Sequence, residues 1–456
     1  MGNPMQHIRE PSKKTPVMAE TDVLVVGSGP GGLSAALACA REGVKTMLVE
    51  RYGCFGGVIT QVGVESLAWY RHQDTIDSEG IGIEFEKRAK AMGGTQKEPQ
   101  SLSQTLNAEL FKSVADTLVT EAGIIPLLHC PAAHVLMEGR TIKGIITESK
   151  SGRQAILARR VIDATGDADI AWRAGVPVRK TPREEMMGVT VVFSCTGVNK
   201  DKFLDYIAEQ KPTYEDWGKN WTIETSGKEE NLFSPYLSEP FQKARKDGAI
   251  PAELTGIGGT WSTISDTGEA TYLNMTYMLD CDGTDVRNLT RAEIDGRKQA
   301  LLAIKALKQY VPGFKKARLR NFGMSVGVRD TRKIIGEYNL SETDVRHQGR
   351  FEDAIGIFPE FIDGYGKLIL PTTGRYFQVP FGILVPQKIE NLLVAGRCVA
   401  GDKISHAAAR NMMCCTVTGQ GAGVAAAISI KESVACRNVN ITMLQKALKK
   451  QGVRIA

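Results

Sequence analysis

Apolar residues at the start of the chain follow a strand–helix–strand pattern. Residues 23–27 form a short apolar run rich in β-branched side chains, which is typical of a strand buried on both faces. Residues 30–41 then repeat their apolar positions at helical spacing, and residues 44–50 return to a strand-like run. Because a parallel pair of strands is usually joined by a helix, this order predicts the start of a parallel α/β sheet.

The following segment adds a helix and a small meander. Residues 103–122 place Leu and Val four positions apart, which predicts an amphipathic helix. Three short runs at 135–137, 142–147 and 156–161 are separated by polar turns that contain glycine. This alternation predicts an antiparallel meander, continued by a strand at 161–166 that ends in small residues.

The pattern then changes over a long middle section. Residues 189–195 and 271–278 read as strands of a separate sheet, and residues 201–248 are polar with scattered aromatics. Residues 291–310 are periodic at helical spacing and stop at Pro312-Gly313. After this section, residues 391–396 predict another parallel strand and residues 416–430 a helix rich in Gly and Ala.

The length, charge and apolar content of the chain limit the class of protein to which it can belong. The 456 residues exceed the roughly 250–300 at which one hydrophobic core stops growing, so two domains are expected. The net charge of +6 comes from scattered Lys and Arg, so we expect no nucleic-acid partner. No apolar run reaches the roughly 18–20 residues of a membrane span, and the first residues lack the apolar segment of a signal peptide. We therefore expect no membrane partner.

The cysteines exclude several kinds of site. There are nine, an odd number, and no two have the C-x-x-C spacing. A disulfide framework, a zinc site and an iron–sulfur cluster are therefore not expected, and no metal is predicted. A reducing cytoplasmic location fits this usage best.

A glycine-rich turn follows the first strand. Gly27, Gly29 and Gly32 have the G-x-G-x-x-G spacing, between the predicted strand and the predicted helix. The first glycine permits the tight turn, the second lets the backbone approach a pyrophosphate, and the third lets helix and strand pack closely. Glu50 ends the second strand, about 20 residues on, where an acid binds a ribose hydroxyl. The segment therefore predicts a dinucleotide site.

The dinucleotide motif and the order of the predicted elements together predict the domain organisation. We expect an α/β fold in which a Rossmann-like domain, with a parallel sheet and a small antiparallel meander, carries an inserted, mainly β substrate domain. The predicted boundaries are a flexible tail at 1–20, a discontinuous Rossmann-like domain at 21–180 and 386–456, and a substrate or cap domain at 181–385.

Further segments favour FAD over NAD. Arg51 and Gly57 follow the ribose acid, the meander ends in Gly166, and Asp402 follows a distant strand-like run at 393–397. With these segments the sequence resembles the FAD-dependent oxidoreductases of the two-dinucleotide-binding-domain type. More narrowly, it is similar to relatives of the heterodisulfide reductase A subunit, without their iron–sulfur motifs. The segments that carry this narrower resemblance are 327–338, 376–386, 391–398 and 410–427.

The resemblance implies roles for particular residues. The adenosine end of FAD would contact Gly27, Gly29, Gly32, Glu50 and Arg51. The flavin end would contact Gly57, Gly166, Asp402, Gly419 and Gln420. A helix starting near Thr418 would direct its N-terminus at the flavin, where the helix dipole stabilises the negative charge of the reduced ring. Many family members have a different sequence where this chain has residues 402–406, a segment that includes Asp402.

Two features of related reductases are missing. Cys54 stands where disulfide reductases carry a redox pair, but Ile59 occupies the partner position. A second G-x-G-x-x-G does not follow a strand, because the glycines at 256–259 lack the strand–helix frame. A dithiol relay and a dedicated NAD(P)H domain are therefore not expected.

Candidate catalytic residues lie in the resembling segments. Arg329, or Arg332 near it, can hold a substrate carboxylate as a bidentate fork, or form an ion pair within the fold. His406 and Arg410 share a helix face, and His406 can act as acid or base, or be structural. Tyr376 can donate a hydrogen bond to a substrate, or cap the sheet.

The cysteines offer two further readings. Cys414 and Cys415 place thiols before the flavin-facing helix, although small buried residues are the simpler interpretation. Covalent flavin attachment through Cys54 or His72 is a less favoured alternative.

Three functions remain open at this point. The first is an FAD-dependent oxidoreductase that moves a hydride between a small organic substrate and flavin N5. The net positive charge favours an anionic substrate or cofactor, or belongs simply to a solvated surface. The second is an FAD-binding electron-relay subunit that needs a partner protein, and the third is a Rossmann protein that binds NAD. The direction of transfer, the electron donor or acceptor and self-association into a homo-oligomer stay open.

Overall fold

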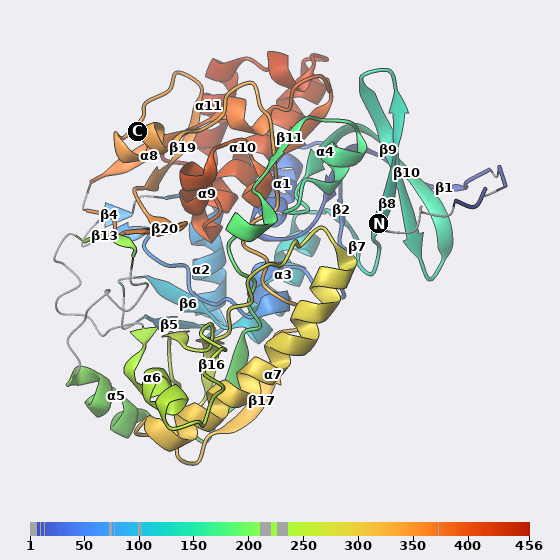
Figure 1. The fold of residues 1–456 in the computed structure, drawn as a ribbon. Helices are drawn as coiled ribbons and strands as arrows, with labels where there is room; N and C mark the ends of the chain where they lie inside the picture. Colours follow the sequence, from blue (N-terminus) through green and yellow to red (C-terminus); the bar gives the residue numbers. More distant parts are fainter. Residues whose placement is uncertain are drawn as a thin grey trace.

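The computed structural model describes residues 7–9, 11–12, 14–72, 75–76, 78–98, 101, 103–209, 220–225, 236–372 and 374–456. One seven-stranded sheet organises the fold (Figure 1). Its order is β7 (Ile125–Leu127), β2 (Thr46–Val49), β1 (Val17–Val26), β10 (Gly152–Asp163), β9 (Thr141–Ser149) and β8 (Ala132–Glu138), with β23 (Leu392–Val394) also paired to β10.

The sheet combines a parallel part with an antiparallel part. β7, β2, β1, β10 and β23 pair in parallel, whereas β10, β9 and β8 form the antiparallel meander at the right of Figure 1. The long strand β10 belongs to both parts, because its first half pairs with β9 and its second half with β23. The predicted parallel sheet and meander are confirmed. Residues 17–20, predicted as tail, instead pair with β10.

Helices α1 (Pro30–Arg41) and α10 (Met412–Lys431) pack against each other beside this sheet. A Cβ atom at Gly419 would lie 2.0 Å from the carbonyl oxygen of Gly31, and one at Gly423 would lie 2.2 Å from that of Ala35. Glycine at these positions therefore lets the two helices approach closely. α1 has the bounds that its apolar spacing predicts, but α10 begins four residues before the predicted start at 416.

α10 is also long and apolar enough to cross a membrane by length and composition. Its apolar window is entirely buried inside the fold. A helix that is apolar on all sides is expected at the centre of a large protein, and α10 has that position here.

The predicted helix at 103–122 is shorter than expected. Residues 104–106 form strand β6 (Gln104–Leu106), which pairs with β5 (Thr95–Lys97), and helix α3 runs from Ala108 to Glu121. Asn107 ends the strand and caps the helix, because its side-chain oxygen accepts hydrogen bonds from the N–H groups of Glu109 and Leu110. Helix α2 (Ile81–Ala91) packs beside α3.

A buried acid ties α3 to the second sheet. Glu65 accepts a hydrogen bond from the N–H of Ala108 at 2.8 Å and another from the hydroxyl of Thr271 at 2.5 Å. Burial raises the pKa of Glu65 from 4.5 to about 7. The folded state therefore holds this proton more tightly than the unfolded state. Its contribution to stability is complete below about pH 4.5 and is lost as the pH rises through about 7.

We expect Glu65→Gln to reduce the pH dependence of stability. Relative to this variant, the unfolding free energy of the wild type should fall by up to roughly 3 kcal/mol as the pH rises from about 4 to 8, since one pKa unit is about 1.4 kcal/mol. Urea titrations of both proteins across this range measure the difference. If the unfolding free energies of the two proteins changed with pH in parallel, the prediction would be contradicted.

A second apolar core lies apart from the first. Its buried residues run from Phe193 to Ala317. Around them lies a five-stranded sheet in the order β14 (Tyr236–Leu237), β15 (Gly259–Trp261), β16 (Ala270–Asn274), β12 (Phe193–Thr196) and β17 (Arg318–Phe322). Helices α5 (Lys200–Ala208), α6 (Glu239–Lys246) and α7 (Val286–Tyr310) accompany it, and α7 runs the length of this part in Figure 1. With these helices this part is more helical than the mainly β domain predicted.

The end of the predicted insertion shares the first core. Ile355, Phe358, Phe377 and Val379 are buried in the same cluster as the parallel sheet. They belong to the antiparallel pair β19 (Ala354–Pro359) and β22 (Tyr376–Pro380). The separate core is therefore shorter than the predicted domain at 181–385.

The remaining elements connect these parts. β13 (Thr222–Glu224) pairs with β21 (Lys367–Ile369), which pairs with β20 (Ile362–Gly364), and β11 (Val178–Lys180) pairs with β18 (Arg332–Ile334). The remaining short helices relevant to the site are α4 (Asp169–Arg173), α8 (Glu342–Arg346), α9 (Lys403–Ala409) and α11 (Ile441–Lys450).

Candidate functional site

A cavity of about 820 Å³ lies at the carboxyl ends of the parallel strands. Val26 and Glu50 line it where β1 and β2 end, and Ala164 and Gly396 line it where β10 and β23 end. Ligands of open α/β sheets bind in this crevice. The cavity also extends to residues of the second sheet, among them Trp261 and Tyr272. Its volume is toward the upper end of the range of about 300–1,000 Å³ that small-molecule and cofactor sites occupy.

The three glycines of the turn serve different purposes. Gly27 has φ +97°, and a Cβ atom there would lie 2.4 Å from the carbonyl oxygen of Ala164. A Cβ at Gly32 would lie 1.8 Å from the carbonyl oxygen of Gly27. Gly29 differs, because its φ is −61° and a Cβ atom would meet nothing within 4 Å. Gly29 and Gly31 line the cavity, whereas Gly32 supports the turn from behind.

The open space beside Gly29 fits a pyrophosphate. It lies at the N-terminus of α1, where unpaired N–H groups and the helix dipole favour an anion. Gly57, with φ +52°, stands close by, since a Cβ there would lie 2.5 Å from the Cα of Gly29. Backbone therefore replaces side chains on both sides of this space. The residues present fit a dinucleotide.

Glu50 is fixed at the wall of the cavity. Its carboxylate accepts hydrogen bonds from the N–H of Ser28 at 2.9 Å, the hydroxyl of Ser28 at 2.6 Å and the N–H of Tyr52 at 3.0 Å. Arg51 also lines the cavity, with its guanidinium 4.8 Å from the ring centre of Tyr52. Both residues therefore line the cavity, and their contact with the adenosine end of FAD stays a prediction.

A polar network that the sequence did not reveal closes another wall. Arg397 donates to Asp167 at 2.7 Å and to Thr331 at 3.2 Å, and Thr331 donates to Asp167 at 2.7 Å. Gly166, with φ +79°, leaves room for Arg397, because a Cβ there would lie 3.0 Å from its Nη2 atom. The network joins the loops after β10 and β23 to the segment before β18. Arg397 lies in one of the resembling segments and Asp167 directly follows the predicted strand at 161–166, but nothing in their spacing indicates that they pair.

Three predicted flavin-end residues do not line the cavity. Asp402 caps α9 by accepting from the N–H of Ser405 at 2.8 Å, and it accepts from the N–H of Glu342 at 2.7 Å. Gln420 accepts from the N–H of Ile81 at 3.0 Å, and Gly419 packs on α1. The structure places all three in supporting positions. Because α10 begins earlier than predicted, Asn411, Met412 and Met413 bring its N-terminus to the cavity instead.

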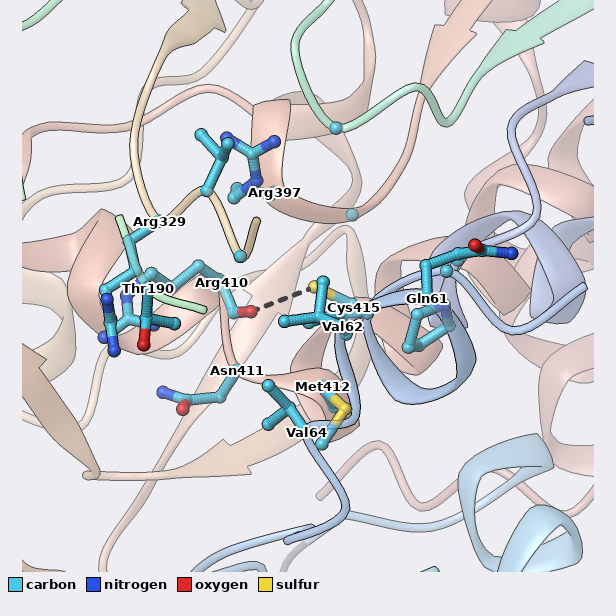
Figure 2. A pocket seen from close by; sticks show the side chains of 18 of the residues that line it. Gln61, Val62, Val64, Thr190, Arg329, Arg397, Arg410, Asn411, Met412 and Cys415 are labelled. Atoms are coloured by element: carbon cyan, nitrogen blue, oxygen red, sulfur yellow. Dashed lines mark hydrogen bonds between the residues drawn. The ribbon is translucent and has the colours of Figure 1, made fainter. Parts of the chain in front are cut away.

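Arg329 and Arg410 both line the cavity (Figure 2). Arg329 donates to the carbonyl of Gly188 at 2.8 Å, and burial lowers its pKa, with the charge of Arg410 adding to the effect. Arg410 lies 3.3 Å from the carboxylate of Asp363 and also bonds to its carbonyl. Its Nε atom is buried and has no hydrogen-bond partner in the described part of the chain. Two guanidinium groups therefore stand near one carboxylate.

His406 is placed behind this pair. It is 4 % exposed and does not line the cavity. Its Nε2 lies 3.1 Å from the carbonyl oxygen of Arg329 and 3.7 Å from Asp330. Burial lowers the pKa of His406 to about 3, and the charge of Lys333 acts in the same direction. A neutral imidazole that donates to a backbone carbonyl positions Arg329, and it supplies no proton near neutral pH.

Other candidates lie away from the cavity. Tyr376 is in β22, with the guanidinium groups of Arg350 and Arg454 at 4.2 and 5.3 Å from its ring centre. Arg332 lies 3.3 Å from Asp169 in an ion pair within the fold.

Of the candidate thiols, Cys415 lines the cavity, with its Sγ 3.3 Å from the carbonyl oxygen of Arg410. Cys54 accepts from the side-chain amide of Gln61 at 2.9 Å, and the side chain of His72 lies outside the described residues.

Comparison with known proteins shows which family the sequence matches. Residues 22–448 match the model of the FAD dependent oxidoreductase family. Among curated proteins, the chain is 27% identical over 198 residues to a digeranylgeranylglycerophospholipid reductase of Picrophilus torridus, covering 41% of this chain and 48% of that protein. It thus spans about half the length of this relative. It is 26% identical over 220 residues to a thiamine thiazole synthase of Saccharolobus islandicus, covering 46% of this chain and 70% of that protein.

Solved structures with a similar fold include a geranylgeranyl bacteriochlorophyll reductase-like protein of Thermoplasma acidophilum. It has a TM-score of 0.49 and 16% identity, covering 95% of this chain and 83% of that one. The family match runs from residue 22 to residue 448 and therefore includes the Gly29 turn, Arg329 and Arg410. It decides between the dinucleotides in favour of FAD. The chain is an FAD-binding enzyme and belongs to the FAD dependent oxidoreductase family.

Proposed function

We propose that this enzyme transfers a hydride between a small organic carboxylate and the N5 atom of FAD. Bound FAD supplies the two-electron chemistry. The observation that carries the proposal is the buried Nε of Arg410, which lacks a hydrogen-bond partner among the described residues beside a second guanidinium. A planar carboxylate would satisfy this donor and balance the excess positive charge.

The chain's own residues would hold and orient the two reactants. The Gly29 turn and the N-terminus of α1 would bind the pyrophosphate, and Arg329 and Arg410 would bind the substrate carboxylate. His406 would keep the backbone of Arg329 in place through its hydrogen bond. Val62, Val64 and Met412, which line the same cavity, would exclude water from the reacting atoms (Figure 2).

We also propose the narrower relationship to relatives of the heterodisulfide reductase A subunit. Arg329, Arg397 and Arg410 lie in the segments that carry this likeness, and all three line the cavity. Electron relay to a partner protein is the alternative. It predicts that no small molecule reduces the flavin and that no carboxylate is turned over when a reductant is supplied. Direct catalysis predicts either anaerobic bleaching of the flavin by at least one carboxylate or reductant-driven turnover of one.

We expect Arg410→Gln to weaken binding of carboxylates. A charge-assisted hydrogen bond contributes about 1.5–3 kcal/mol, so the dissociation constant should rise roughly 10- to 100-fold. The measurement is titration of the FAD-loaded protein with small carboxylates and with their neutral amides, followed by flavin absorbance.

Arg350→Gln is the matched control, because Arg350 is exposed and its guanidinium stacks on Tyr376 away from the cavity. The control should bind as the wild type does. Equal carboxylate affinity in Arg410→Gln and the wild type would refute the assignment of this anion site.

A further inference from the structure

A buried carboxyl group lines another part of the same cavity. Glu98 follows β5 and is 6 % exposed. Ser101 donates to one of its oxygens at 2.8 Å, and Ser262, which follows β15 of the second sheet, donates to the other at 2.8 Å. The described part of the chain offers Glu98 no cationic partner. Burial raises the pKa of its carboxyl.

A buried carboxyl without a counter-ion is costly, and the cost is removed when a cation binds beside it. Each oxygen of the Glu98 carboxylate already accepts one hydrogen bond from a serine hydroxyl, and these hydrogen bonds favour the charged form. Aromatic side chains line the same cavity, among them Trp261, which precedes Ser262, and Tyr272. A carboxylate and aromatic rings that line one cavity together are the groups that bind an ammonium ion.

We propose that the cavity takes a substrate with two charged ends, a carboxylate held at Arg329 and Arg410 and a protonated amine held at Glu98. The carboxylate end rests on the proposed function above, while the amine end rests on Glu98 alone. Both ends belong to one compartment, because Glu98, Arg329 and Arg410 line the same cavity. The substrate class is therefore an amino acid or a longer amino carboxylate.

The test uses the FAD-loaded enzyme and two matched series of probes. One series is the unbranched ω-amino carboxylates from glycine to 6-aminohexanoate, and the other is the alkyl carboxylates with CH₃ in place of NH₃⁺. Flavin absorbance reports binding. We expect at least one amino carboxylate to bind about tenfold or more tightly than its alkyl partner.

Glu98→Gln should abolish this preference and leave alkyl carboxylate binding unchanged, because glutamine keeps the shape and loses the charge. If every alkyl carboxylate binds as well as its amino partner, or if Glu98→Gln retains the preference, the proposal is overturned. The comparison of amino carboxylates with alkyl carboxylates needs only the wild type, so it tests the proposal even if Glu98→Gln fails to fold. A wrong assignment of the carboxylate site at Arg329 and Arg410 would give a different result. In that case Arg410→Gln would bind alkyl carboxylates as tightly as the wild type does.

Discussion

Replacing Gly29 by valine is expected to abolish FAD binding while leaving the fold intact. The backbone at Gly29 has φ −61°, which any residue adopts, and a Cβ atom there meets nothing within 4 Å. The valine side chain would therefore fit the protein and occupy the space of the pyrophosphate. Losing two or more charge-assisted contacts there should weaken FAD binding at least about 100-fold, or about 2.7 kcal/mol.

The measurement is flavin content after purification, followed by titration of the apoprotein with FAD. Circular dichroism and the urea midpoint of the apoproteins should match between Gly29→Val and the wild type. Gly27→Val is the contrasting variant, since its Cβ would lie 2.4 Å from the carbonyl oxygen of Ala164 and its φ is +97°. It should lose both stability and FAD. Stoichiometric flavin in purified Gly29→Val would contradict the proposed pyrophosphate position.

The sequence was informative where local physics decides the structure. Residues 30–41 form a helix with the predicted bounds, because apolar spacing and the glycine-rich turn agree there. The meander followed from alternating runs and glycine turns in the same way. Gly29 and Glu50 could be assigned to the cavity because the turn fixes which atoms face a ligand.

The errors lie where tertiary packing decides. α10 is apolar on every side, so no period marks its start, and Asn411 makes no side-chain capping bond. The resemblance implies flavin contacts for Gly419 and Gln420, together with a helix that starts near Thr418, but in the structure these two residues pack against α1 and α2. Glu98 was missed for a different reason. Its partner Ser262 is far away in the sequence, and an isolated acid after a short strand carries no motif.

Exchanging Asp330 for asparagine is expected to cost about 3–5 kcal/mol of unfolding free energy, because it leaves a buried ammonium group without its counter-ion. The side chains of Asp330 and Lys333 are 0% and 1% exposed and form an ion pair. Tyr365 also donates to Asp330, and burial lowers the pKa of Lys333. The only other groups bonded to this ammonium within the described residues are the hydroxyl of Thr181 at 3.3 Å and the carbonyl of Thr331 at 3.2 Å.

Urea unfolding of the FAD-loaded protein measures this cost, and the chain offers a control of the same spacing. Lys298 and Asp295 are also three residues apart but are 71% and 46% exposed, so Asp295→Asn should cost no more than about 0.5 kcal/mol. Adding Lys333→Met to Asp330→Asn should recover part of the loss, since it removes the stranded charge. Equal costs for the buried and exposed pairs would contradict the argument. Because Asp330 adjoins both Arg329 and His406, the same variant should also weaken carboxylate binding, which links the stability of this cluster to the site in front of it.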